Sequence, residues 1–264
     1  MGRGDDVAGE GTFERTIVVG DLDREYTLHI GTAAWGRSDV HLVVDLHGLN
    51  SNPPAQDDLS GFRAKADEEG FVVAQPQAAG VVPTWQAGMT PSPDVDFLRT
   101  VIADVSSLID VGSVFLSGFS NGGGMAHRFA CDAPGEVTAI GTVAGAYPDS
   151  GPCEGPVPVI AFHGTGDPVV PFRGAGFLLP DVTEWSASWA QRAGCVESAA
   201  SEVASDVSET TWRQCDADAS VRLYVIADGG HGWPGTTSTP RFLNSTDAIS
   251  ATDLMWDFFS VLAA

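Results

Sequence analysis

The sequence predicts an α/β fold, with a mostly parallel central sheet, helices on both faces and an antiparallel hairpin at the amino-terminal end. Two short strand-like segments, 14–20 and 24–30, are separated by Asp21-Leu22-Asp23, which is typical of a hairpin turn. The next segment, 41–46, is a largely apolar run, as expected of a strand buried on both faces. Strand-like and helix-like segments then alternate, which is typical of parallel sheets with crossover helices.

Helical periodicity, glycines and capping residues place the remaining elements. Gly70 is expected to end one helix, and Asp94 to cap the next. Residues 1–264 show no repeat or linker, so we expect a single domain. The segment 165–220 is longer than a simple crossover, and we expect it to be an insertion over the carboxyl edge of the sheet, where α/β proteins bind ligands. Helices are expected over 55–69, 95–109, 122–132 and 247–262 and around Trp185 and Trp189, and strands over 71–74, 113–116, 137–143, 157–162 and 221–227.

The formal net charge of −22 at pH 7 indicates a strongly acidic surface. Such a surface repels nucleic acid and anionic membranes, so neither is expected as a partner. No apolar run approaches the roughly 20 residues that span a bilayer, and the first residues lack the apolar stretch of a signal peptide. We therefore expect either a cytosolic protein or the mature form of a secreted one.

The cysteines favour secretion. None of the four, Cys131, Cys153, Cys195 and Cys215, belongs to a C-x-x-C pair, so no metal site is expected. Four cysteines allow three disulfide connectivities. Pairing of sequence neighbours would close two loops of roughly 20 residues, and each bridge would stabilise the fold by about 3 kcal/mol on the chain-entropy model. Four unpaired, buried cysteines are the alternative.

A G-x-S-x-G pattern, Gly118-Phe119-Ser120-Asn121-Gly122, lies between a predicted strand and a predicted helix. This context predicts a nucleophile elbow, a strained turn that approaches neighbouring backbone too closely for side chains at the flanking glycines. The amino end of the following helix favours negative charge that develops near the serine. Ser120 is therefore the predicted nucleophile, and a glycine-rich loop without chemistry is the alternative.

A serine hydroxyl is a poor nucleophile until a base takes its proton, and on this fold the acid and then the histidine follow the serine in the chain. Of the six histidines, only His163 and His231 lie beyond the helix that follows Ser120. His231 stands in a glycine-rich loop after the last predicted strand, whereas His163 ends a strand. His231 is therefore the predicted general base.

The predicted acid is Asp167, in the loop that directly follows strand 157–162. A carboxylate there would hold the imidazole in one tautomer and stabilise the imidazolium. Asp149 and Asp228 are the competitors, but Asp149 comes one strand too early and Asp228 lies on the loop of the histidine itself.

An oxyanion hole needs two backbone N–H donors. Asn121 is expected to supply one and Leu49 the other, with Gly48 and Asn50 as alternatives to Leu49 and with His47 bracing the loop. Aromatic residues are candidates for substrate contact, although burial in the core is the commoner role of such residues. They are Trp233, which is two residues from His231, and Trp85, followed by Phe172 and Trp185.

These motifs resemble the bacterial extracellular esterases of the polyhydroxybutyrate depolymerase-like group, which includes feruloyl and acetylxylan esterases of the first carbohydrate-esterase family. The resemblance covers about residues 15–262 and implies the α/β-hydrolase fold, the triad Ser120, Asp167 and His231, secretion and no cofactor. Depolymerase-type members often carry Cys-Thr-Gln where this chain has Leu49-Asn50-Ser51, which weakens a polyester assignment. The matching pieces are Leu46-His47-Gly48, Asp94-Val95-Asp96-Phe97-Leu98, Leu116-Ser117-Gly118-Phe119-Ser120-Asn121-Gly122-Gly123, the segment from Phe162 to Pro171, and Gly229-Gly230-His231-Gly232-Trp233-Pro234-Gly235.

Taken together, the residues and the resemblance predict a secreted serine carboxylic ester hydrolase that works through an acyl-enzyme. The expected partner is a small-molecule or polymeric ester, with feruloyl or acetyl esters of plant polymers first and hydroxyalkanoate polyesters or oligomers second. Two other function classes stay open. One is a serine peptidase or amidase of the same fold, and the other is a secreted binding protein that keeps the fold without its chemistry.

Overall fold

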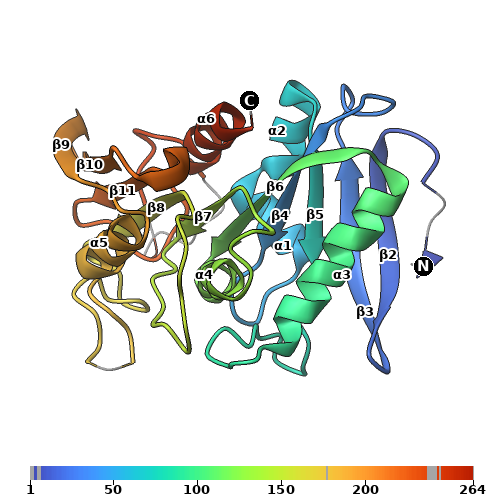
Figure 1. Cartoon of the computed structure of the whole chain (residues 1–264), viewed down its shortest axis with the longest axis horizontal. Helices are drawn as coiled ribbons and strands as arrows, with labels where there is room; N and C mark the ends of the chain where they lie inside the picture. Colours follow the sequence, from blue (N-terminus) through green and yellow to red (C-terminus); the bar gives the residue numbers. More distant parts are fainter. Residues whose placement is uncertain (1–2, 5–6, 177, 237–242, 244, 264) are drawn as a thin grey trace.

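The structure is a computed structural model that describes residues 3–4, 7–176, 178–236, 243 and 245–263 (Figure 1). Eleven strands in these residues form one sheet, in the order β1-β2-β3-β5-β4-β6-β7-β8-β11-β10-β9. They are β1 (Arg3–Gly4), β2 (Gly11–Val19), β3 (Leu22–Ile30), β4 (Val40–Leu46), β5 (Val72–Pro76), β6 (Val111–Phe119), β7 (Ala139–Val143), β8 (Val159–Gly164), β9 (Glu197–Ala204), β10 (Val207–Arg213) and β11 (Val221–Ile226).

The pairing of the strands confirms the predicted sheet. Strands β5, β4, β6, β7, β8 and β11 pair in parallel, whereas β1 to β3 at one end and β9 and β10 at the other pair antiparallel. The loops that follow β4, β6, β8 and β11 therefore leave the sheet at the same edge. This edge is where open α/β sheets bind their ligands.

Helices cover both faces of the sheet (Figure 1). One face packs against α3, α4 and α5 through buried residues such as Phe97, Phe129 and Trp189, and the other packs against α2 and α6 through Phe62 and Phe259. Within the described residues, no helix is both long enough and apolar enough to cross a membrane. Their bounds are α1 (Pro53–Ser60), α2 (Phe62–Glu69), α3 (Pro93–Leu108), α4 (Asn121–Asp132), α5 (Val182–Arg192) and α6 (Ala251–Leu262), with a short 3-10 turn over Asp216–Asp218.

The helix predicted over 55–69 is two helices, because Gly61 interrupts it. Gly61 has a φ of 68°, in the left-handed region that glycine adopts readily, and its N–H donates to the carbonyl of Asp57. The helical periodicity continues across Gly61 and therefore predicted one helix. The glycine itself was the one local signal for a break.

Asp94 is not the cap of α3; Ser92 is. The Ser92 hydroxyl accepts from the N–H of Asp94, whereas the Asp94 carboxylate is buried and accepts from Arg24 at 3.0 Å and from the N–H of Gln86 at 2.8 Å. The Arg24 guanidinium also lies 3.8 Å from the centroid of the Phe97 ring. Asp94 therefore ties α3 to β3 and to the loop before α3.

The segment 165–220 extends the sheet more than it covers it. Strands β9 and β10 form a hairpin that adds to the edge of β11, at the far end of the sheet from β1 (Figure 1). Only the first part of the segment, up to α5, lies in the loop that follows β8. We expected this segment to lie over the carboxyl edge of the sheet. That expectation is wrong for residues 197–213, which extend the sheet instead.

Candidate active site

The G-x-S-x-G segment forms the strand–turn–helix that the pattern predicts. Ser120 lies between β6 and α4 with a φ of 54° and a ψ of −117°. This conformation is rare and strained for a residue with a side chain, and it occurs mostly at functional sites. The N–H of Ser120 donates to the carbonyl of Val143 at 2.9 Å, and the carbonyl of Ser120 accepts from Gly124 at 3.0 Å, so the turn is held from both sides.

Close backbone packing explains the two glycines of the motif. A Cβ added to Gly118 would lie 2.3 Å from the carbonyl carbon of Gly122, and one added to Gly122 would lie 2.2 Å from the carbonyl oxygen of Leu46. No real Cβ tolerates such contacts, because they lie well inside the van der Waals distance. The turn at Ser120 is therefore fixed against the end of β4, which leads into the loop of His47.

Asp167 and His231 are hydrogen-bonded in the structure. The Asp167 Oδ2 lies 2.8 Å from the His231 Nδ1, and the Asp167 Oδ1 accepts from the N–H groups of Val169 at 2.8 Å and Val170 at 2.9 Å. Burial acts to raise the pKa of Asp167, but its hydrogen bonds with His163 and His231 outweigh burial and hold that pKa well below its usual range. Asp167 is therefore an ionised acceptor.

The ionised carboxylate determines the tautomer of His231. A carboxylate has no proton to donate, so His231 Nδ1 must carry the hydrogen of the 2.8 Å bond. In this tautomer, Nε2 is the ring nitrogen that carries the lone pair and can accept a proton. The His231 ring centroid lies 4.9 Å from that of Phe119, the residue directly before Ser120. The imidazole ring that carries this nitrogen is therefore packed against the residue before Ser120.

The loops that carry Asp167 and His231 are locked together by their backbones. Gly166 donates to the carbonyl of Gly229 at 2.9 Å, and the N–H of Asp228 donates to the Thr165 hydroxyl at 2.8 Å. A Cβ on Gly164 would lie 2.1 Å from the carbonyl oxygen of Gly229. This close approach accounts for the glycines in both loops.

The competing residues lie in other surroundings. His163 Nε2 lies 2.8 Å from the carbonyl of Val170 and 3.4 Å from the Asp167 carboxylate, so it supports the loop of Asp167. Asp149 pairs with His127 and Arg192 instead. The Asp228 side chain is exposed, on a residue with a positive φ of 54°. None of these contacts points to a different acid for His231.

The loop after β4 is braced by His47, as expected. The His47 Nδ1 lies 2.7 Å from the carbonyl of Gly48, and Nε2 accepts from the N–H of Ala78 at 3.0 Å. Burial lowers the pKa of His47, so the ring is neutral. The N–H of Asn50 donates to the carbonyl of Pro83 at 2.8 Å and is therefore occupied. Of the predicted alternatives for the oxyanion donor, Leu49 and Gly48 remain.

Asn121 begins α4, where the first N–H groups of a helix have no partner within the helix. Its side chain makes two hydrogen bonds with the backbone of Trp85: Oδ1 accepts from the N–H at 2.7 Å and Nδ2 donates to the carbonyl at 3.2 Å. This pair orients the residue whose N–H is expected in the oxyanion hole. No motif in the sequence indicates this second role for Asn121.

The aromatic residues predicted to contact substrate are buried in the core. Trp85 is 2% exposed and donates from Nε1 to the carbonyl of His47, and Trp233 is 1% exposed and donates to the Thr252 hydroxyl. Phe172 and Trp185 are also buried. Side chains buried to this degree offer almost no surface to a ligand. We therefore correct the role of Trp85 and Trp233 from substrate contact to bracing of the loops that carry His47 and His231.

Tyr147 lies beside the site, although no sequence motif marks it. A Cβ on Gly124 would lie 2.5 Å from its ring, so the ring is packed on the first turn of α4, and its hydroxyl interacts with the side chain of Asn121. Burial raises the pKa of Tyr147, so its hydroxyl keeps its proton. The run of three glycines from Gly122 to Gly124 was the available signal, because a helical turn without side chains leaves room for the close approach of neighbouring segments.

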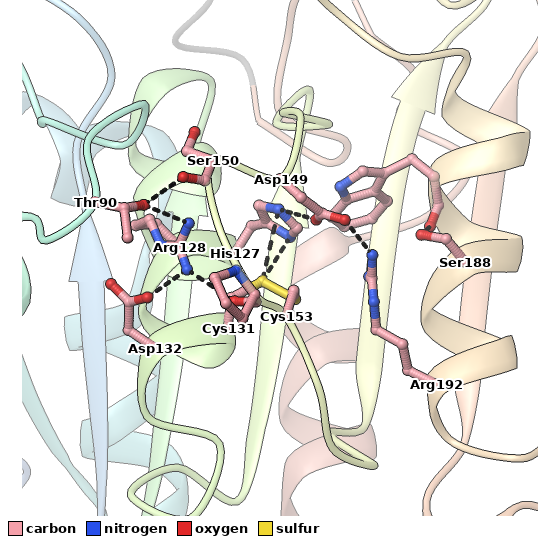
Figure 2. Close-up of a disulfide and its surroundings, with 12 residues drawn as sticks. Thr90, His127, Arg128, Cys131, Asp132, Asp149, Ser150, Cys153, Ser188 and Arg192 are labelled. Carbon is pink, nitrogen blue, oxygen red and sulfur yellow. Dashed lines mark hydrogen bonds and ion pairs between the residues drawn. A yellow bond between two sulfur atoms is a disulfide. The ribbon is translucent and has the colours of Figure 1, made fainter.

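Tyr147 lies on the segment 144–153, which we call the strap. Figure 2 shows the disulfide, the hydrogen bond and the ion pairs that hold the strap to α4, to α5 and to the loop before α3. Cys153 is bonded to Cys131 of α4, the carbonyl of Ser150 accepts from the Thr90 hydroxyl, and Asp149 lies 3.1 Å from the Nε2 of buried His127. Asp149 also pairs with Arg192 of α5.

His127, Cys131 and Asp149 lie close enough together to suggest a metal site. The donor set does not fit one, because the Cys131 sulfur is bonded to Cys153 and offers no thiolate. The second bridge joins Cys195, after α5, to Cys215, after β10. Of the three possible connectivities, the structure therefore has the pairing of sequence neighbours.

Several known proteins that resemble the chain are named esterases. The NocK protein of Nocardia uniformis subsp. tsuyamanensis, provisionally named an esterase, is 30% identical over 96% of this chain and 83% of its own length. The chain belongs to this esterase family. Feruloyl esterase C of Emericella nidulans is 28% identical over 89% of the chain and 83% of its own length. No protein-family model matches the chain.

Solved structures agree in fold. An acetyl xylan esterase from Aspergillus awamori superposes with a TM-score of 0.68 at 15% identity, over 94% of this esterase and 98% of that chain. A ferulic acid esterase superposes with a TM-score of 0.59 at 11% identity, over 97% and 98%. The chain is thus a carboxylic ester hydrolase with the α/β-hydrolase fold.

Proposed function

We propose that this esterase is a secreted serine hydrolase that works through an acyl-enzyme, with Ser120 as nucleophile, His231 as general base and Asp167 as the acid that orients His231. Residues 1–264 act as a single catalytic domain. The observation that carries the proposal is the 2.8 Å bond between Asp167 and His231, on a ring packed against the residue before Ser120. An oriented histidine beside a strained serine turn is the arrangement that acyl transfer needs.

In the proposed reaction, the Ser120 oxygen attacks the ester carbonyl while His231 Nε2 takes the hydroxyl proton. The carbonyl oxygen becomes an oxyanion that accepts hydrogen bonds from the N–H groups of Asn121 and Leu49. The imidazolium, stabilised by Asp167, then gives its proton to the leaving alcohol. Water, activated by the same histidine, attacks the acyl-enzyme and restores Ser120. No step requires a cofactor.

The proposed substrates are feruloyl or acetyl esters of plant polymers. The support comes from relatives and neighbours named for these activities, among them feruloyl esterase C and acetyl xylan esterase. A panel of methyl ferulate, acetylated xylan, short p-nitrophenyl esters and a hydroxybutyrate polymer tests the class. Turnover of the polymer with none of the feruloyl or acetyl esters would contradict it.

Secretion is supported by the two disulfides, because such bridges form and persist in oxidising compartments. Expression with and without export to an oxidising compartment tests this proposal. The exported protein should carry both bridges and full activity, and a fully active protein with four free thiols in the cytosol would contradict it.

The serine mechanism is tested with Ser120→Ala. Its turnover of p-nitrophenyl acetate should fall by roughly a thousandfold or more, and an active variant would overturn the assignment. Matched aryl ester and anilide substrates separate the esterase from a peptidase of the same fold. A faster reaction with the anilide would favour the peptidase.

A further inference from the structure

A groove of about 600 Å³ opens between the β2–β3 hairpin and the start of α1. Glu14 on β2 and Glu25 on β3 line it from the sheet, together with Thr27. Pro53 and Pro54, the first residues of α1, line it as well. The lining of the groove therefore combines apolar proline rings with carboxylates, and nothing in the proposed acyl transfer uses it.

The polar groups of the groove suit hydroxyl ligands. The Thr27 hydroxyl donates to the Glu14 carboxylate at 3.1 and 3.2 Å, which fixes that carboxylate on the sheet face. Asn52 also lines the groove; its Oδ1 accepts from the N–H of Ala55 as the cap of α1, so its NH₂ group is the part left to donate. Carboxylates accept strongly from hydroxyl groups, and the proline rings offer an apolar surface for the C–H face of a sugar ring.

Gln77 connects the groove to the oxyanion loop. It lines the groove, and its N–H donates to the carbonyl of Glu25 at 2.9 Å. Its Nε2 lies 3.2 Å from the Nε2 of His47 and donates to the carbonyl of Ser51 at 3.3 Å. One residue thus contacts the oxyanion loop through its side chain and the wall of the groove through its backbone.

The groove also lies near the oxyanion loop along the chain. Asn52 follows Leu49 by three residues, and three residues of extended chain span at most about 11 Å. A ligand whose ester carbonyl lies at the N–H of Leu49 can therefore extend its next units into the groove. The acidic surface and the carboxylates disfavour an anion. The substrate proposed above places a neutral, hydroxyl-rich group next to its ester bond, and we take that group as the occupant.

We propose that this groove binds the sugar units of a glycan ester, as a subsite for the alcohol portion of the substrate beside the oxyanion loop. The proposal rests on the ester hydrolysis proposed above. It assigns a role to Glu25, Glu14 and the Pro53–Pro54 wall that the acyl-transfer steps do not give them.

The first test measures binding without chemistry. Ser120→Ala protein is titrated calorimetrically with unesterified xylo-oligosaccharides and, separately, with an oligolysine peptide. We expect the oligosaccharide to bind and Glu25→Gln in the same background to weaken it about tenfold, the scale of one lost charged hydrogen bond. Glu197→Gln, an exposed glutamate on β9 at the other end of the sheet, is the matched control and should bind like the parent.

The second test is kinetic and separates this proposal from the function on which it rests. The ratio of kcat/KM for a feruloylated oligosaccharide to that for methyl ferulate should fall about tenfold in Glu25→Gln, through KM, and stay unchanged in Glu197→Gln. An unchanged ratio in Glu25→Gln, or binding of the cationic peptide without the oligosaccharide, would overturn the groove proposal while leaving ester hydrolysis intact. Absence of turnover on both esters would instead contradict the proposed function.

Discussion

Removal of the Cys131–Cys153 bridge should affect both stability and activity. The bridge closes a separation of 22 residues, and the Cys195–Cys215 bridge closes one of 20. On the chain-entropy model, the loss of either bridge destabilises the fold by about 3 kcal/mol, because loop-closure entropy depends only weakly on length. The two double serine variants should therefore unfold at similar urea concentrations.

Activity should distinguish the two variants. Cys153 attaches the strap to α4, and the strap carries Tyr147. Tyr147 packs on Gly124 and interacts with Asn121. The other bridge joins the ends of α5 and β10 instead. We expect kcat/KM on methyl ferulate to fall about fivefold without the first bridge, equivalent to about 1 kcal/mol of transition-state stabilisation. The remaining contacts of Asp149 and Ser150 still hold the strap and limit the loss of activity.

The assay compares urea unfolding and steady-state kinetics for Cys131→Ser/Cys153→Ser and Cys195→Ser/Cys215→Ser, at a temperature where both remain folded. The second variant should keep the kcat/KM of the parent. Equal loss of activity in both variants, or full activity in the first despite its loss of stability, would refute the reasoning that the strap positions the first turn of α4.

Further predictions concern single side chains. Tyr147→Ala should lower kcat/KM severalfold while Tyr147→Phe keeps most of it, because the ring packs on Gly124; equal values for both variants would contradict a packing role. Arg24→Met leaves the Asp94 carboxylate buried without its cation and should cost about 3–5 kcal/mol in urea unfolding; a loss below about 1 kcal/mol would argue against that pair. Burial lowers the pKa of His127 despite Asp149, so the folded state keeps the ring neutral and the unfolded state protonates first as the pH falls. The free energy of unfolding should therefore decline below about pH 6.5. Urea unfolding at several pH values should show a shallower decline for His127→Gln; the same decline in variant and parent would contradict His127 as its cause.

Much of the fold was predictable, because the strands and helices that matter leave local signals. The run at 41–46 and the strand before Ser120 are buried on both faces, and α4 follows a glycine turn, so pattern and structure agree there. The exposed hairpin of β9 and β10 was not predictable in the same way. Nearly every residue of β9 is exposed, so the strand lacks the apolar alternation on which the interpretation depended.

For the candidate site, sequence order could place Asp167 near His231, because both residues follow parallel strands that end at the same edge. It could not place Trp85 and Trp233, because whether an indole faces a ligand or the core depends on distant partners such as the carbonyl of His47 and the Thr252 hydroxyl. Tyr147 and the strap were missed for the same reason. Their contacts to α4 span the sequence and follow from tertiary packing.

The central claim is that Asp167 holds His231 in the tautomer that activates Ser120. Labelling with a fluorophosphonate, followed by peptide mapping by mass spectrometry, tests it most directly. We predict modification of Ser120 alone, and labelling of His231→Ala and Asp167→Ala that is slower by roughly a thousandfold. Labelling of another residue, or labelling of the two variants at the rate of the parent, would contradict the claim.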